Sequence, residues 1–81
     1  MNILEQILEN YYEQDFLIAD GFNDAVIGVE INSMCLIYSV SKCLEILGEH
    51  MSEEDAIEYF EYNISNAYVG QQTPIWCYDN F

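Results

Sequence analysis

Apolar residues near the start of the chain recur with the period of an α-helix. Their spacing predicts an amphipathic helix over residues 2–14. The apolar stripe of this helix comprises Ile3, Leu4, Ile7, Leu8 and Tyr11. Three glutamates, one turn apart, fall on the opposite face: Glu5, Glu9 and Glu13. The helical period is lost in the next segment, where Gly21 and Asn23 predict a turn.

Two short runs rich in β-branched residues predict a pair of strands. Residues 25–30 (AVIGVE) form the first strand, residues 34–38 (MCLIY) form the return strand, and residues 32–33 form the turn between them. The helical period resumes at Val40, and Gly48 predicts the end of this second helix. The apolar positions of the second helix are Val40, Cys43, Leu44 and Leu47.

A third helix is predicted to follow Ser52. Ser52 and Asp55 have the spacing of a capping box, and an acidic first turn suits the positive end of a helix dipole. We expect this helix to run to about Ser65, with Ile57, Phe60 and Ile64 facing inward. Residues 74–78 (PIWCY) predict a short strand that begins at a proline, where the missing N–H does least harm.

The expected order of elements, α-β-β-α-α-β, predicts an α+β fold in which the helices pack on one face of a small, mostly antiparallel sheet. The length of 81 residues indicates a single domain over residues 1–81. A hydrophobic content of 52% indicates a packed core rather than a disordered acidic tail.

Three cysteines without close spacing are a poor disulfide framework, so we expect buried, reduced thiols at Cys35, Cys43 and Cys77. No apolar run reaches the roughly 18 residues of a membrane span, and the first residues lack a basic leader region. A soluble protein in the cytoplasm of a host cell is therefore expected.

Charge changes this picture most. The chain has fifteen Asp and Glu residues against a single Lys, Lys42, and its formal net charge is −14. Like charges at helical neighbour spacing each cost on the order of 0.2–0.5 kcal/mol. A surface built only for solubility normally intersperses lysines and avoids that cost. The pattern favours a surface that presents a negative field to a basic partner, with a merely solvated acidic face as the other interpretation.

Candidate chemistry is sparse. His50 is the only histidine, and no serine or cysteine is tied to it by a motif. Cys35, Cys43, Cys77 and His50 would make a Cys₃His zinc set, but no close cysteine knuckle is present. Residues 20–24 (DGFND) lack the length and final glutamate of a calcium loop. We therefore expect no enzyme, no cofactor and no metal.

The chain resembles a widespread group of small proteins encoded by phages and other mobile elements. The resemblance lies in KCLEIL, MSEEDAIEYFEYN, AYVG and TP within residues 42–77, with AVIGVE upstream. The matching positions include Lys42, Glu45, Met51, Glu58, Tyr59, Phe60, Asn63, Tyr68, Gly70, Thr73 and Pro74. One departure is Asn66, where the group has glycine. The resemblance implies a phage-type origin and brings no activity or site residues with it.

Nucleic-acid-binding clefts are the commonest strongly basic surfaces in a cell, and a rigid acidic domain can occupy one in place of phosphates. Glutamates one turn apart are about 6 Å apart along a helix, whereas a DNA strand carries a charge every ~3.4 Å. The first and third helices, side by side, would approach that density. Tyr62 is a candidate anchor within the acidic field, and Tyr12 flanks the first helix.

The sequence thus predicts a non-enzymatic inhibitor or decoy that binds a basic host protein, a nucleic-acid-binding component of host defence, in an anti-CRISPR or anti-restriction role. Direct binding to nucleic acid or membranes is not expected, because both are anionic. The candidate partner-binding residues are Glu5, Glu9, Glu13, Glu54, Asp55, Glu58, Glu61 and Tyr62. The alternatives are a small adaptor or homodimer that uses its apolar and tyrosine surface, and an unpartnered acidic domain of a salt-adapted organism.

Overall fold

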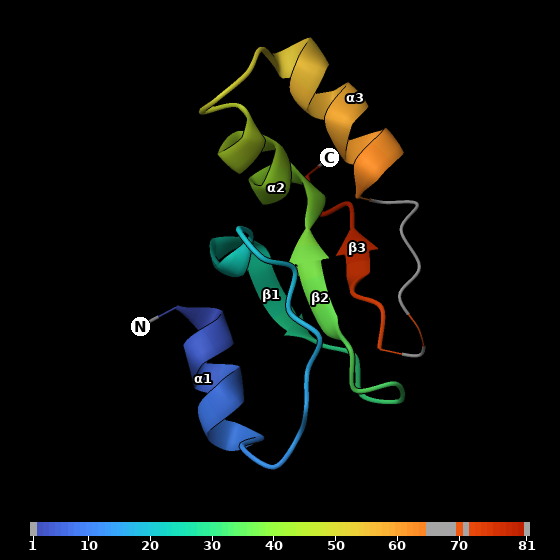
Figure 1. Cartoon of the computed structure of the whole chain (residues 1–81). Coiled ribbons are helices and arrows are strands. Elements are labelled where there is room, and N and C mark those ends of the chain that lie inside the picture. The colour runs from blue at the N-terminus through green and yellow to red at the C-terminus, as the bar shows by residue number, and fades with distance from the viewer. Residues whose placement is uncertain (1, 65–69, 71, 81) are drawn as a thin grey trace.

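The computed structural model describes residues 2–64, 70 and 72–80. Within these ranges it contains three α-helices, one 3₁₀ turn and a three-stranded sheet (Figure 1). The elements in chain order are α1 (Ile3–Asn10), η1 (Asn23–Ala25), β1 (Val26–Val29), β2 (Leu36–Ser39), α2 (Val40–Leu47), α3 (Glu53–Asn63) and β3 (Ile75–Cys77). The predicted α+β class and the predicted order are confirmed.

The sheet has the order β1-β2-β3. β1 and β2 form the predicted antiparallel hairpin, and its register shifts between Val26 and Gly28. After the two following helices the chain returns to the free edge of β2, where β3 pairs in parallel and Trp76 lies opposite Tyr38. These two aromatic residues therefore share one face of the sheet, because directly paired residues project to the same side.

The hairpin turn is held by the carboxylate of Glu30. Its two oxygens accept hydrogen bonds from the backbone N–H groups of Asn32 (2.8 Å) and Ser33 (3.0 Å). These bonds favour the charged carboxylate and lower the pKa of Glu30. The turn closes with a bond from the N–H of Met34 to the carbonyl of Glu30 (2.8 Å). Met34 has a φ of 55°, a left-handed conformation that costs an L-residue roughly 1–2 kcal/mol.

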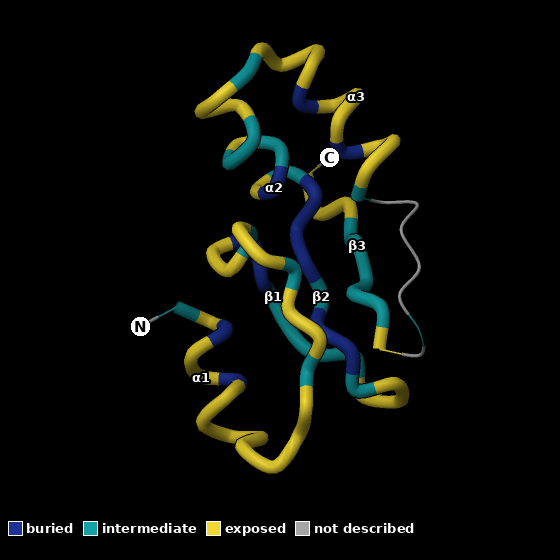
Figure 2. Tube along the Cα trace, in the orientation of Figure 1, coloured by how far each residue is buried: buried dark blue, intermediate teal, exposed yellow. Residues whose placement is uncertain are grey.

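The core is centred on β2 (Figure 2). Tyr38 and Leu36 are almost fully buried there. The other buried members of the core cluster come from α1, η1, β1, α2 and α3 and are Leu4, Ile7, Ala25, Val26, Val40, Cys43 and Phe60. Trp76 packs against the cluster, with its ring 5.1 Å from that of Tyr38 and 5.4 Å from that of Phe60. The C-terminal strand and α3 are thus joined to the central strand by aromatic contacts, tilted between Trp76 and Tyr38 and edge-to-face between Trp76 and Phe60.

The first helix is shorter than predicted. It begins after Asn2, whose side chain accepts a hydrogen bond from the N–H of Glu5 (2.9 Å), and it ends at Asn10 rather than at residue 14. The Asn10 side-chain amide donates to the Gln6 carbonyl (2.9 Å) at that end. Only Leu4 and Ile7 of the predicted apolar stripe are buried; Ile3, Leu8 and Tyr11 remain 37–45% exposed. Because α1 has only eight residues and packs on β1, it buries only a narrow strip of its apolar surface.

The third helix begins as predicted, since the Ser52 hydroxyl accepts a hydrogen bond from the N–H of Asp55 (3.2 Å). Its buried face was predicted wrongly in one position. Ala56 and Phe60 are buried at 1% and 2% exposure, whereas Ile57 is 39% exposed. Ala56 and Phe60 are one turn apart, and Ile57 is rotated about 100° away from Ala56 around the helix. The predicted end at Ser65 lies outside the described residues.

Candidate partner-binding surfaces

The face of α3 that points away from the core carries the predicted acidic cluster. Ala56 and Phe60 define the buried side, so residues about half a turn from them point to solvent. We call this surface the α3 acidic face; it consists of Glu54, Asp55, Glu58, Glu61 and Tyr62, all exposed. Tyr62 is 74% exposed. The five predicted α3 residues are thus exposed on one face of the helix, and their role in partner binding stays a prediction.

A second acidic surface lies on α1. Glu5 and Glu9 are exposed and project from the side of α1 opposite Leu4 and Ile7. Glu13 is also exposed, but it lies in the turn after the end of the helix and does not continue the helical stripe. Tyr12, in the same turn, is 81% exposed.

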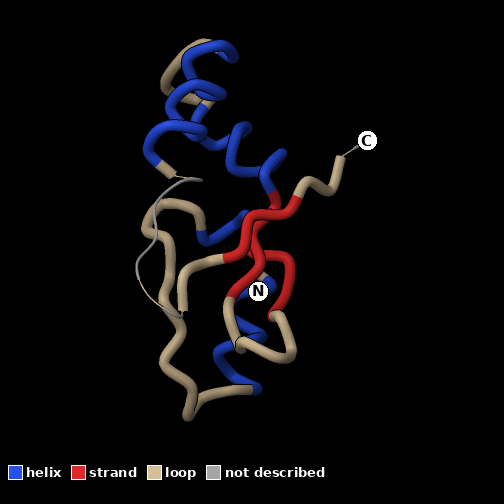
Figure 3. The backbone as a smooth tube through the Cα atoms, turned by 90° about the vertical axis from the view of Figure 1, so that its right-hand side faces the viewer, coloured by secondary structure: helices blue, strands red, loops and turns tan. Residues whose placement is uncertain are grey.

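The two acidic helices do not lie side by side. Figures 1 and 3 place α1 at one end of the molecule and α3 at the other, with the sheet between them. The longest extent of the protein is 38 Å. The prediction that α1 and α3 combine into one duplex-like face is therefore wrong, because each helix packs on a different part of the core. α1 lies against β1, whereas α3 lies against α2.

The α3 acidic face reaches a nucleic-acid-like charge density without α1. Glu54, Asp55, Glu58 and Glu61 span seven residue steps of one helix. These steps cover about 10.5 Å of helix axis in rises of about 1.5, 4.5 and 4.5 Å, so the carboxylates are on average about 3.5 Å apart along it. That average is close to the ~3.4 Å of helix axis per phosphate of one DNA strand. Glu5 and Glu9 on α1 are about 6 Å apart by the same measure.

The single lysine, Lys42, lies in the first turn of α2, near Asp79 in the C-terminal segment. The Asp79 carboxylate accepts hydrogen bonds from the hydroxyls of Ser39 (2.7 Å) and Ser41 (3.1 Å) at the start of α2. These bonds, the Ser39 bond above all, lower the pKa of Asp79, and the charge of Lys42 lowers it further. The Ser39 hydroxyl also accepts a bond from the N–H of Lys42 (3.2 Å). The bonds from Ser39 and Ser41 to Asp79 therefore tie the C-terminal segment to α2, and Lys42 adds a favourable charge beside them.

The remaining candidate groups show little reactive chemistry. His50 is exposed in the connection between α2 and α3. Cys35 and Cys43 are buried as predicted, Cys77 is only half-buried, and none of the three forms a disulfide. Burial raises the pKa of the Cys43 thiol to about 12, which keeps this sulfur protonated and a poor nucleophile. Among the described residues, no three His, Cys, Asp or Glu side chains are grouped as a metal site would require.

Comparison with protein-family models, curated proteins and solved structures finds no match. In the part of the chain that the structure describes, no helix has the length and apolar character needed to cross a membrane.

One surface feature was missed in the sequence. Residues 16–19 (FLIA) lie in the segment assigned only to a break in periodicity, yet Leu17 and Ile18 are each 39% exposed. They line an apolar groove together with Pro74 and Trp76. A run of four apolar residues outside a helical or strand pattern was the available signal. Its partners come from distant parts of the chain, which periodicity cannot identify.

Proposed function

We propose that this protein is a non-enzymatic inhibitor or decoy, and that its α3 acidic face occupies a basic nucleic-acid-binding surface of another protein. The observation that carries the proposal is the mean axial spacing of about 3.5 Å between the four carboxylates on one exposed helix face. A surface that recognises a strand of phosphates presents Lys and Arg at a matching spacing. The α3 acidic face offers such a surface four anions on one side of a single helix.

Tyr62 adds an anchor to this row. Its ring is 74% exposed within the α3 acidic face. Tyrosine combines a large contact area with low conformational entropy, and it stacks well on the guanidinium plane of arginine. Arginine is common in nucleic-acid-binding surfaces, so the same partner would supply both the charges for the carboxylates and a stacking group for Tyr62. The acids then govern the encounter, and the tyrosine governs the lifetime of the complex.

The resemblance to phage-type proteins supports a host defence component as the partner, in the cytoplasm of the host cell. Inhibition of a CRISPR or restriction system is the most concrete form of this proposal. The choice of such a target rests on the resemblance to the phage-type group and not on the geometry of α3. The α1 surface, with its wider spacing, contributes mainly to the long-range field in this scheme.

A second candidate is an adaptor or homodimer. The observation in its favour is the apolar surface left exposed on α1, where Ile3 and Leu8 are 41% and 37% exposed beside Tyr11 at 45%. A second copy or another protein that packs against α1 would bury these residues. Sedimentation equilibrium tests the homodimer, because self-association gives a concentration-dependent mass. An adaptor for another protein is separated from the decoy by nucleic-acid competition, since nucleic acid should not release a partner bound to the apolar surface of α1.

The proposed function is tested by affinity capture from host lysate with three immobilised proteins. These are the wild type, the α3 triple variant Glu54→Gln/Glu58→Gln/Glu61→Gln, and the matched α1 triple variant Glu5→Gln/Glu9→Gln/Glu13→Gln. We expect the wild type and the α1 triple variant to capture the same nucleic-acid-binding protein, and DNA or RNA to release it. The α3 triple variant should capture much less of it. Equal capture by all three proteins, without competition from nucleic acid, would reject the decoy proposal.

A further inference from the structure

A groove of about 260 Å³ separates the segment before η1 from the end of α3 and the start of β3. One wall comes from residues 17–20 and Phe22, and the other from residues 63–64, Pro74 and Trp76. Most of these side chains are apolar. The volume is below the roughly 300–1,000 Å³ of sites that enclose a small-molecule ligand. Its size suits one or two inserted side chains of a peptide.

Both walls of the groove are fixed by the core. The backbone N–H of Ala19 donates a hydrogen bond to the hydroxyl of the buried Tyr38 (2.8 Å), and the N–H of Phe22 donates to the Ala19 carbonyl (3.1 Å). On the other side, Trp76 packs between the rings of Tyr38 and Phe60. The groove is therefore formed before any partner binds, which lowers the entropic cost of occupying it.

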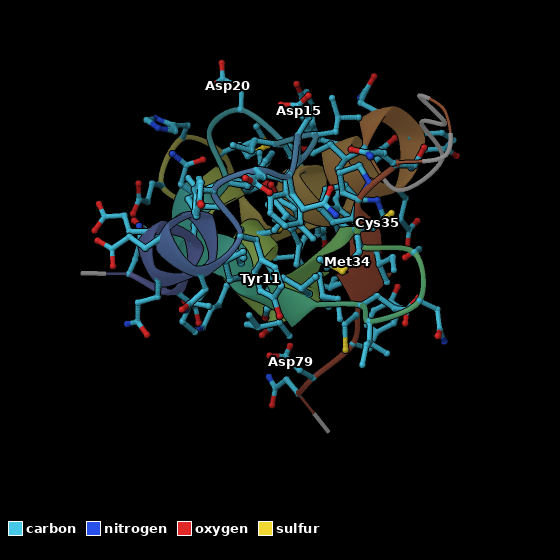
Figure 4. The ribbon with its side chains drawn as sticks, turned by 90° about the horizontal axis from the view of Figure 1, so that it is seen from below. Tyr11, Asp15, Asp20, Met34, Cys35 and Asp79 are labelled. Carbon is cyan, nitrogen blue, oxygen red and sulfur yellow. The ribbon has the colours of Figure 1, made fainter. Side chains whose placement is uncertain are left out.

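The groove has an acidic margin. Asp20 is among its lining residues. Asp15 precedes the same wall, and Figure 4 shows Asp15 and Asp20 projecting outward along one edge of the molecule, with Asp79 at the opposite edge. None of the groove's described lining residues is Lys or Arg. An apolar channel with a carboxylate at its margin is complementary to an apolar side chain flanked by a cation.

Charge also argues against a second copy of this chain in the groove. Each copy carries a formal net charge of −14 and contributes only one lysine. Two copies would bring like charges together at this margin, whereas a basic segment would neutralise Asp15 and Asp20.

We propose that this groove binds an extended basic segment of a partner protein, with an apolar side chain inserted against Trp76 and a Lys or Arg beside Asp20. The groove is distinct from the α3 acidic face, since its lining includes none of the five residues of that face. The inference therefore goes beyond the proposed decoy function. A partner that engages both surfaces would gain avidity, because the second contact becomes intramolecular.

The test selects peptides from a random display library on the wild-type protein. We expect enriched peptides to carry an apolar residue next to or near Lys or Arg. Trp76 is the only tryptophan in the chain, so binding of a selected synthetic peptide should shift the protein's tryptophan emission. Ile18→Gln should weaken peptide affinity by about tenfold or more, as expected when a pocket contact is lost. Asp20→Asn should weaken it less and make it less sensitive to salt.

Ile31→Gln is the matched control, because Ile31 is 82% exposed in the hairpin turn and is not part of the groove. It should leave peptide affinity unchanged. Circular dichroism establishes that each variant is folded, and Leu17→Gln serves as a second groove variant. The α3 triple variant should still bind the peptide, which separates this inference from the decoy proposal. Failure to enrich peptides, enrichment without basic residues, equal loss in Ile31→Gln, or self-association through the groove would overturn the proposal.

Discussion

The hydroxyl of Tyr38 accepts a hydrogen bond from the backbone N–H of Ala19 at 2.8 Å, across a separation of 19 residues in the chain. Tyr38 is fully buried in the central strand, while Ala19 lies in the irregular segment that leads to η1. This bond holds the segment against the sheet and sets one wall of the apolar groove. The segment has no regular secondary structure of its own to hold it there.

Tyr38→Phe should therefore destabilise the protein measurably. The substitution removes the acceptor and leaves the N–H of Ala19 unsatisfied in a partly buried position, at a cost of about 1–3 kcal/mol. Urea denaturation measures this change in the free energy of unfolding. Tyr12→Phe removes a hydroxyl from a residue that is 81% exposed and should change stability by no more than about 0.5 kcal/mol. Equal effects of the two substitutions would contradict the structural role of the Tyr38 hydroxyl.

Met34→Gly should stabilise the hairpin, whereas Met34→Val should destabilise it. The φ of 55° at Met34 is favourable for glycine and unfavourable for a β-branched residue. Glycine relieves the backbone strain at this position, but it also raises the chain entropy of the unfolded state. The net gain in the free energy of unfolding is therefore about 0.5 kcal/mol. Thermal unfolding measures the melting temperatures of the two variants and the wild type, and Met34→Gly should have the highest and Met34→Val the lowest. If valine is tolerated as well as glycine, the left-handed turn is not present in solution.

Asp79 should contribute stability at neutral pH that is lost in acid. Hydrogen bonds from Ser39 and Ser41, with the charge of Lys42, lower its folded-state pKa below the ordinary value of 3.8. A carboxyl group with a depressed folded-state pKa stabilises the fold above its unfolded pKa, and the contribution disappears as pH falls through the folded pKa. Protonation of the other acidic residues instead stabilises the fold in acid, because it relieves the repulsion between their charges.

The contribution of Asp79 is isolated by Asp79→Asn, which keeps the shape of the side chain and removes its charge. The difference in melting temperature between wild type and this variant should be largest near neutral pH and should shrink below pH 3.8, where Asp79 itself becomes protonated. Asp15→Asn is a suitable control because Asp15 is exposed in the segment after α1. A difference that does not change with pH would show that the charge of Asp79 has no part in the contact.

Local signals in the sequence identified most of the elements, because caps and turns depend on neighbours. Ser52 and Gly48 bound their helices as predicted, and the hairpin turn forms where expected. The helical period also placed Phe60 correctly on the buried face of α3. The sequence pattern did not predict the exposure of Ile57 or the separation of α1 from α3, because both depend on which elements pack together. The bond between Tyr38 and Ala19, which shapes the groove, depends on the same long-range packing.

Added salt should raise the melting temperature at neutral pH. Salt screens the repulsion among exposed carboxylates, of which the chain has a large excess, over a Debye length of about 10 Å at 0.1 M. A melting temperature that stays flat or falls between low and moderate sodium chloride would contradict the account of an unbalanced acidic surface. The α3 triple variant should show a weaker salt dependence than the wild type.

Glu58→Gln should stabilise the protein while it weakens partner binding. Glu58 has acidic neighbours at helical spacing in Glu54, Asp55 and Glu61, and each like-charge pair costs on the order of 0.2–0.5 kcal/mol. The expected gain in the free energy of unfolding is therefore about 0.6–1.5 kcal/mol. Urea denaturation measures the gain. A destabilised Glu58→Gln variant would mean that Glu58 makes a structural contact.

The association rate of the captured partner tests the decoy proposal most directly. Stopped-flow mixing at several salt concentrations would compare the wild type with the α3 triple variant and the α1 triple variant. The account predicts that the α3 triple variant associates at least about tenfold more slowly at low salt, with a much flatter salt dependence, while the α1 triple variant stays close to wild type. It also predicts that nucleic acid competes with the wild type for the same partner. Equal association rates for all three proteins, with no competition from DNA or RNA, would contradict it.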